Sequence, residues 1–173
     1  MRNEDQGISG DAQRLEQLGW MLFLKILDDK DQENEVIRDG YQSVIPPKFQ
    51  WRNWAADREG ITGDELLIFI DDSTEGLFTT LKNLKSVHSP KRAELVREVF
   101  DGSNNYMKSG FAMRKVINQL NGFDFNNSDD RHIFGTIYES ILLELRDAGN
   151  KGEFYTPRAI TQLMTQRSEE HTS

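Results

Sequence analysis

Residues 15–27, Leu-Glu-Gln-Leu-Gly-Trp-Met-Leu-Phe-Leu-Lys-Ile-Leu, place apolar side chains nearly all round a helix. Leu15, Leu18, Leu22 and Ile26 form one stripe at helical spacing. The flanks of that stripe are apolar too, at Trp20, Met21, Phe23, Leu24 and Leu27. A helix that is apolar all round is buried on most of its surface. We therefore predict a core helix over residues 10–30, followed by an acidic helix tail and a loop up to Gly40.

The rest of the chain repeats the helical pattern. Capping residues and apolar residues at helical spacing predict helices over residues 63–71, 74–85, 90–100, 110–120 and 129–148. Thr62 and Ser128 are the expected N-caps of the first and last of these helices, and Ser89-Pro90 opens the third. Strand signals are almost absent. The predicted fold class is all-α, with a multi-helix N-terminal domain over residues 1–149.

Composition and charge exclude several classes of function. With 173 residues, 36% hydrophobic and 29% charged, the chain is long enough for one ordinary soluble domain. It contains no run of apolar residues long enough to span a membrane and starts with polar residues, so we expect a cytoplasmic protein without membrane contact. The net charge of −8 argues against a stand-alone DNA-binding domain.

Two local groups of basic residues interrupt this acidic background. The first comprises Lys82, Lys85, His88, Lys91 and Arg92, and the second Lys108, Arg114 and Lys115. No aromatic residues alternate with these charges, so we interpret both groups as solvated helix faces. The chain has no cysteine, and its three histidines show no metal-ligand spacing. No metal site is expected.

Residues 45–49, Ile-Pro-Pro-Lys-Phe, have the two prolines that some adenine methyltransferases use beside the target base. That motif needs Asn or Asp in front of the prolines to bind the target amino group, and Ile45 stands there instead. We therefore predict only a proline turn. The aromatic residues that follow, Phe49, Trp51 and Trp54, are expected to pack in the core or against another domain.

The stretch Gly-Asn-Lys-Gly-Glu-Phe-Tyr-Thr-Pro, residues 149–157, predicts a loop between two helices. Its two glycines end the long helix, and Thr156 with Pro157 provides an N-cap and a first helical residue. Backbone N–H groups and the positive end of the new helix would then face one spot that suits a carboxylate or phosphate. A capped joint without any ligand is the alternative, and the local chemistry does not decide between them.

A family resemblance rests on three stretches of the chain. Gly-Glu-Phe-Tyr-Thr-Pro at residues 152–157 follows a helix that reads Ile-Phe-Gly-x-Ile-Tyr-Glu-x-x-Leu at residues 133–142. Residues 21–29 are similar to the first helix of the same family. The chain thereby resembles the methyltransferase (M, HsdM-type) subunits of type I restriction-modification systems. In that family the loop lines the S-adenosylmethionine pocket, which implies cofactor binding by Glu153, Phe154, Tyr155, Thr156 and Pro157.

The resemblance also implies an activity and partners. The parent subunit would transfer a methyl group from S-adenosylmethionine to adenine N6 in double-stranded DNA. A specificity subunit would choose the site, and a restriction subunit could join the complex. Within the loop, Tyr155 would pack near the cofactor, and Thr156 would donate to its methionine carboxylate.

Two motifs of the complete enzyme are missing from the sequence. It contains no Gly-x-Gly turn and no Asn/Asp-Pro-Pro-Phe/Tyr motif, so no catalytic residue can be assigned and the chain alone is expected to be inactive. Residues 150–166 are expected to open a Rossmann-like α/β methyltransferase domain with its first helix. Residues 167–173 match one translated frame of a common sequencing adapter, and we expect them to be an artefact rather than a genuine polar C-terminus.

Two other classes of function compete with this interpretation. The chain could be a self-contained helical interaction or adaptor domain without catalytic activity, which would leave residues 152–157 without a purpose. A helix-turn-helix DNA reader is disfavoured, because the net charge is negative and no helix carries a basic recognition face.

Overall fold

The computed structural model describes residues 11–127, 129–130 and 132. The helices are α1 (Asp11–Ile37), α2 (Trp51–Trp54), α3 (Gly63–Asp71), α4 (Leu77–Lys82), α5 (Pro90–Asp101) and α6 (Gly110–Leu120), with a 3-10 turn, η1, at Pro47–Phe49. No strand occurs in this part of the chain. The all-α prediction is confirmed.

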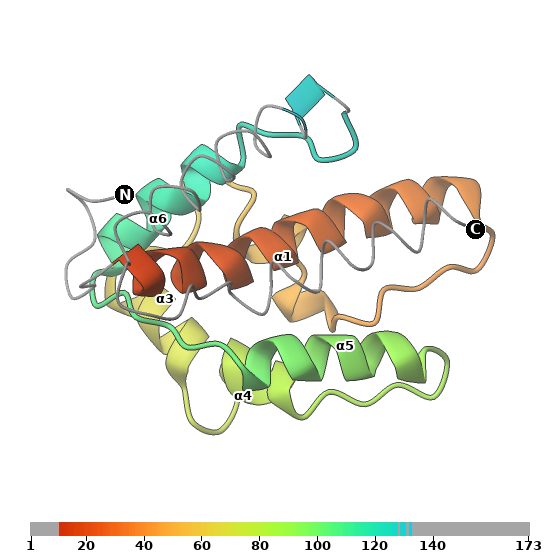
Figure 1. Cartoon of the computed structure of the whole chain (residues 1–173), viewed down its shortest axis with the longest axis horizontal. Coiled ribbons are helices and arrows are strands. Elements are labelled where there is room, and N and C mark those ends of the chain that lie inside the picture. The colour runs from red at the N-terminus through yellow and green to blue at the C-terminus, as the bar shows by residue number, and fades with distance from the viewer. Residues whose placement is uncertain (1–10, 128, 131, 133–173) are drawn as a thin grey trace, which may run out of the picture.

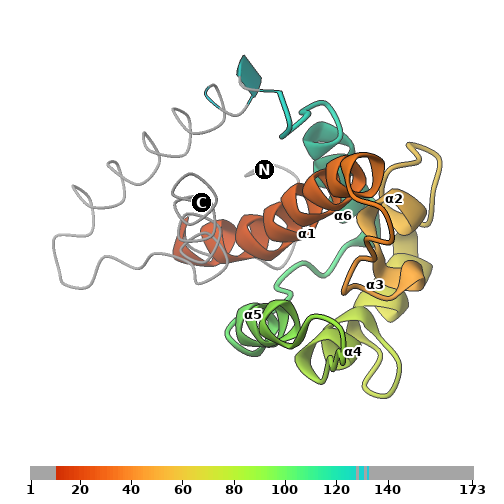
Figure 2. The ribbon, with the colours of Figure 1, turned by 90° about the vertical axis from the view of Figure 1, so that its right-hand side faces the viewer.

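Helix α1 runs through the middle of the domain (Figure 1), with α6 on one side and the α4–α5 pair on the other. Of its apolar residues over 15–27, all are buried as predicted except Leu18 and Ile26, which are partly buried, and Trp20, Met21 and Phe23 are fully inaccessible to solvent. The Trp20 ring meets Phe78 of α4 edge to face at 4.9 Å, and Phe78 meets Phe100 of α5 at 5.0 Å. These aromatic pairs join the three helices into one core. Figure 2 shows α4 and α5 side by side, below α1 in that view.

A second set of aromatic residues packs α2 and η1 against α3. The rings of Phe49 and Trp54 each lie 5.3 Å from the ring of Phe69. The indole N–H of Trp51 donates to Asn121 at 2.7 Å, just past the end of α6. Phe49, Trp51 and Trp54 are all buried, and Ile45 with them. The predicted proline turn and the predicted packing role of these aromatic residues are confirmed.

Helices α3 and α6 approach each other at their first residues, Gly63 and Gly110. A Cβ atom on Gly110 would lie 1.8 Å from the carbonyl oxygen of Gly63, so only glycine fits there. Gly63 itself has a φ of +60°, a conformation that favours glycine. Thr62 precedes α3 as predicted, but its hydroxyl makes no capping bond and instead donates to the Gly110 carbonyl at 3.4 Å.

Some predicted helix bounds are wrong. Helix α1 continues to Ile37 instead of ending near Lys30, and α4 covers only Leu77–Lys82 rather than residues 74–85. Residues 73–76 form a turn because the Asp72 carboxylate accepts hydrogen bonds from the backbone of Thr74 and Glu75. Helices α5 and α6 lie within one residue of their predicted bounds. Among the described helices, none is long and apolar enough to cross a membrane.

Candidate functional site

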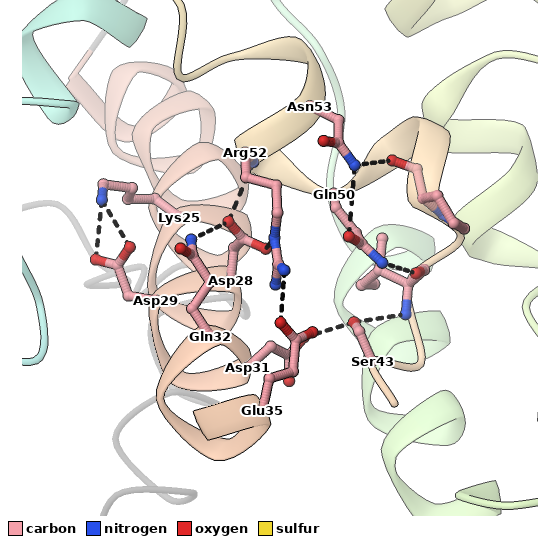
Figure 3. Close-up of polar contacts among 12 residues, drawn as sticks. Lys25, Asp28, Asp29, Asp31, Gln32, Glu35, Ser43, Gln50, Arg52 and Asn53 are labelled. Carbon is pink, nitrogen blue, oxygen red and sulfur yellow. Dashed lines mark hydrogen bonds and ion pairs between the residues drawn. The ribbon is translucent and has the colours of Figure 1, made fainter. Parts of the chain in front are cut away.

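The C-terminal half of α1 carries three aspartates that are almost inaccessible to solvent. Asp28, Asp29 and Asp31 are 4%, 8% and 1% exposed. Burying a carboxylate is costly unless cations or hydrogen-bond donors surround it. Each of the three has such partners, some from the neighbouring turn of α1 and others from segments further along the chain. Figure 3 shows Lys25 beside Asp29 and Arg52 beside Asp28. We call these aspartates and their partners the α1 charge network.

Asp28 binds α2 to α1 through Arg52. The Arg52 Nε atom lies 2.9 Å from one Asp28 oxygen, and the Arg52 backbone N–H donates to the other at 3.1 Å. Arg52 reaches further along α1 to Glu35, with Nη1 2.7 Å from the carboxylate. Burial lowers the pKa of Arg52, but its bonds to Glu35 and Asp28 outweigh that effect, so the pKa lies above its ordinary value. Arg52 stays charged at any physiological pH.

Asp31 holds the connection after α1 and the start of α5. Its carboxylate accepts hydrogen bonds from Tyr41 at 2.6 Å and Ser43 at 2.5 Å, and Arg92 of α5 lies 3.3 Å away. Arg92 also donates to the Tyr41 hydroxyl oxygen. Burial, followed by the hydrogen bond and charge of Asp31, raises the pKa of Tyr41. Tyr41 therefore remains a neutral hydrogen-bond donor.

Asp29 bonds the segment after α6 to α1. Lys25, one turn earlier on α1, binds its two carboxylate oxygens at 2.8 and 2.9 Å. The backbone N–H of Phe125 donates to the same carboxylate at 3.0 Å, and the side chain of Asn126 donates to the Asp29 carbonyl at 2.6 Å. The segment directly before the predicted helix 129–148 is thus bonded to α1.

Arg114 of α6 organises the connection between α2 and α3. Its guanidinium group donates to the carbonyl oxygens of Trp54, Ala55, Asp57 and Ile61 at 2.7–3.1 Å. The residue is only 6% exposed, and burial lowers the pKa of its guanidinium group. The interpretation of Arg114 as part of a solvated face is therefore wrong. Its planar group of donors replaces water for a loop that lacks secondary structure.

These arrangements determine what the described residues can do. Each buried aspartate of α1 is already bonded to cations or donors, so none is available as an acid, a base or a ligand. No group of three metal-binding side chains comes together in the described ranges. The α1 charge network and Arg114 instead hold the connections of the domain in fixed positions.

The predicted cofactor loop lies elsewhere in the chain. Glu153, Phe154, Tyr155, Thr156 and Pro157, the predicted N-cap Ser128 and the helix 129–148 beyond residue 132 lie outside the described residues. The α1 charge network was missed from the sequence, where residues 28–40 were expected to be an acidic helix tail followed by a loop. The spacing of Lys25 and Asp29, four residues apart, was the one local signal for it.

Comparison with known proteins identifies the family. The model for the HsdM N-terminal domain matches residues 1–121, and the chain belongs to this family. The model for N-6 DNA Methylase matches residues 129–173. The resemblance to type I methyltransferase subunits is thereby confirmed.

Individual relatives agree with the family. The chain is 53% identical over 165 residues to the type I restriction enzyme EcoEI methylase subunit of Escherichia coli. This match covers 95% of the chain but a third (33%) of that relative's length. A modification subunit assigned to a type I restriction enzyme of Vibrio vulnificus YJ016 has a crystal structure that matches 96% of the chain and 37% of its own, with 39% identity and a TM-score of 0.74.

A second solved structure, which describes complex assembly and conformational transition of the type I R-M system, contains a similar chain. It matches 89% of this chain and 30% of its own length, at 30% identity and a TM-score of 0.71. The fold of the domain is therefore that of type I methylase subunits.

Proposed function

We propose that this chain is the N-terminal part of the DNA-methylating subunit of a type I restriction-modification system. The parent subunit transfers a methyl group from S-adenosylmethionine to adenine N6 in double-stranded DNA. The observation that carries this proposal is the order of the two family matches, the HsdM N-terminal domain at 1–121 and N-6 DNA Methylase at 129–173. Asp29 binds Phe125 at the junction between them.

The proposal divides the chain into two parts. Residues 1–149 form the helical N-terminal domain, and residues 150–166 begin the cofactor-binding domain. Glu153, Phe154, Tyr155, Thr156 and Pro157 form the loop on the cofactor side, where a capped helix start provides donors for the methionine carboxylate. No residue of the chain is assigned to the chemical step.

The helical domain contributes positioning to this activity. Asp29 holds the segment after α6 against α1, so the described domain has a fixed position at residues 125–126. The partners are a specificity subunit, a restriction subunit and, through that complex, double-stranded DNA. The place of action is the cytoplasm. Helices joined by buried charge pairs resist relative movement, which suits a domain that closes on DNA as a unit.

The test is methyl transfer by the longer protein. The source gene is sequenced past the codon for Gln166, and its reading frame is expressed together with the neighbouring specificity gene. We expect incorporation of tritiated methyl groups from S-adenosylmethionine into duplex DNA as N6-methyladenine. The 173-residue chain should transfer none, because it has neither the Gly-x-Gly turn nor the Asn/Asp-Pro-Pro-Phe/Tyr motif. A reading frame that ends without these motifs would contradict the proposal.

A self-contained interaction domain is the second candidate. This candidate is favoured by the three buried aspartates of α1, Asp28, Asp29 and Asp31. Their carboxylates are bonded within the domain and cannot act as an acid, a base or a nucleophile. The same sequencing experiment separates the two. An interaction domain predicts a stop codon after Ser173, and the purified chain should then bind a protein partner without any cofactor.

A further inference from the structure

The connection between α4 and α5, together with α4 itself and the first turn of α5, has a charge opposite to that of the rest of the chain. Residues 76–93 contain four of the 21 Lys and Arg residues and none of the 29 Asp and Glu residues. The remaining chain is left with 17 basic and 29 acidic residues. Figure 1 shows this connection running along the outer edge of the domain past α5. This stretch is therefore locally basic on a protein whose net charge is −8.

Three lysines and one histidine of this stretch are exposed to solvent. Lys82, Lys85, His88 and Lys91, which we call the basic loop, occur at every third position and are all exposed. In the described part of the chain, no carboxylate lies within ion-pairing distance of the three lysines. Lys82 has an internal contact, with its Nζ atom 5.9 Å from the centre of the Phe78 ring. The charges are thus available to a partner.

Buried contacts hold the basic loop in place. Leu84 is 7% exposed, and its carbonyl oxygen accepts a hydrogen bond from Arg97 of α5 at 2.5 Å. The Ser89 backbone N–H donates to the Ser86 hydroxyl at 2.9 Å. Arg92, at the far end, is bonded to Asp31 of the α1 charge network. The exposed lysines therefore project from a backbone that is fixed on both sides.

The structure changes the interpretation of these residues as one solvated helix face. Lys85 and His88 lie in a loop, Lys82 ends α4 and Lys91 is in the first turn of α5. Arg92 is only partly exposed and has internal partners. What remains exposed is a row of three lysines and a histidine that spans two helices and their connection.

We propose that the basic loop binds backbone phosphates of the double-stranded DNA on which the parent subunit acts. Lysines bind phosphates as point charges without reading sequence. The central part of a protein–protein interface is, in contrast, poor in lysine and rich in aromatic residues and arginine. The basic loop presents three lysines, and Val87 is the one large exposed apolar residue between Lys82 and Lys91. The inference rests on the proposed function, since it assumes that the assembly binds duplex DNA.

This contact would also orient the domain. An acidic surface repels the phosphate backbone, whereas the basic loop is attracted to it. The domain would therefore approach DNA with the α4–α5 end, and the rest of its surface would stay away from the duplex.

The test compares two variants of the methylase subunit assembled with its specificity subunit. The first is Lys82→Gln/Lys85→Gln/Lys91→Gln. The control, Arg38→Gln/Arg58→Gln/Lys108→Gln, removes the same charge from exposed residues outside the basic loop. Binding of a fluorescently labelled duplex is measured by anisotropy over a series of salt concentrations. Duplexes with and without the recognition site are both used.

We expect the first variant to bind both duplexes about tenfold more weakly at low salt. The slope of log K against log salt should fall by about 0.9 for each lost phosphate contact, and the control should keep the wild-type slope. If the wild-type complex binds and methylates DNA and the first variant has the same slope as the wild type, the inference is overturned and the proposed function stands. Loss of the specificity subunit with an unchanged slope would assign the basic loop to a protein contact and overturn it as well. A wild-type complex that binds no duplex would contradict the proposed function itself.

Discussion

Arg52 and Asp28 form an ion pair between α2 and α1, with 2.9 Å between Nε and Oδ1. The pair is asymmetric, because the Asp28 side chain is 4% exposed and the Arg52 side chain 25%. Arg52 can therefore exchange bonds with water, while Asp28 depends on the protein for its solvation. This ion pair connects α2, which is only four residues long, to α1.

Replacing Arg52 should expose this dependence. Arg52→Met leaves the buried Asp28 carboxylate without its cation, and we expect the free energy of unfolding to fall by about 3 kcal/mol. Urea denaturation of the 173-residue chain measures the change. The matched variant Arg58→Met, at an exposed position, should stay within about 0.5 kcal/mol of the wild type.

Combining Arg52→Met with Asp28→Asn gives a further check on the same pair. Because Asp28→Asn removes the buried charge that needs the cation, the double variant should lose less stability than the two single variants together. Simple addition of the two losses would show that the pair contributes nothing as a pair.

Arg114 should be irreplaceable by lysine. Arg114→Met removes the donors of four carbonyl groups, and we expect a loss of roughly 3 kcal/mol in unfolding free energy. Arg114→Lys keeps the charge but cannot donate in the same plane to all four, so it should recover less than about half of that loss. Full recovery by lysine would mean that the charge, and not the geometry of the donors, matters.

Gly110 is expected to tolerate no side chain. In Gly110→Ala the new Cβ atom would collide with the Gly63 carbonyl, which forces α3 and α6 apart and should cost at least about 3 kcal/mol. Gly40→Ala is the control, because Gly40 has a φ of +75° but nothing within 4 Å of the added atom. Gly40→Ala should lower the free energy of unfolding by only about 1 kcal/mol, because of backbone strain. Thermal unfolding measures both variants. An equal loss of stability in Gly110→Ala and Gly40→Ala would contradict the close approach of Gly110 to the Gly63 carbonyl.

The neighbouring residues Asp71 and Asp72 should affect the pH dependence of stability in opposite directions. Burial of its carboxyl group beside Asn105 raises the pKa of Asp71 above the ordinary 3.8, so this group favours folding at low pH and loses that effect as the pH rises above 3.8. Backbone hydrogen bonds from Glu75 and Thr74 lower the pKa of Asp72. Its contribution is present above pH 3.8 and is lost as the pH falls through the lowered value.

Asparagine at either position keeps an acceptor and removes the titration. Between about pH 3 and about pH 7, Asp71→Asn should become more stable relative to the wild type as the pH rises, and Asp72→Asn should become less stable. Unfolding free energies at several pH values measure both trends. Parallel trends in the two variants would refute the assigned pKa directions.

The candidate cofactor site is predicted from sequence similarity alone. Local chemistry predicts a loop and a helix start there, from two glycines, a capping threonine and a proline, and the family resemblance adds the cofactor role of residues 153–157. They lie outside the described residues, so their role stays a prediction. The α1 charge network, by contrast, could not be assigned from its own segment.

The sequence by itself determined the all-α class, the burial of α1 and the position of α5 and α6, because helical periodicity and caps depend on residues within a few positions. Only the tertiary structure decided that α1 continues to Ile37 and that Arg114 is buried. Asp28 meets a cation 24 positions away, and Arg114 meets carbonyl groups 53–60 positions away. Whether a charged residue is solvated or buried depends on what packing brings beside it, and no local pattern contains that information.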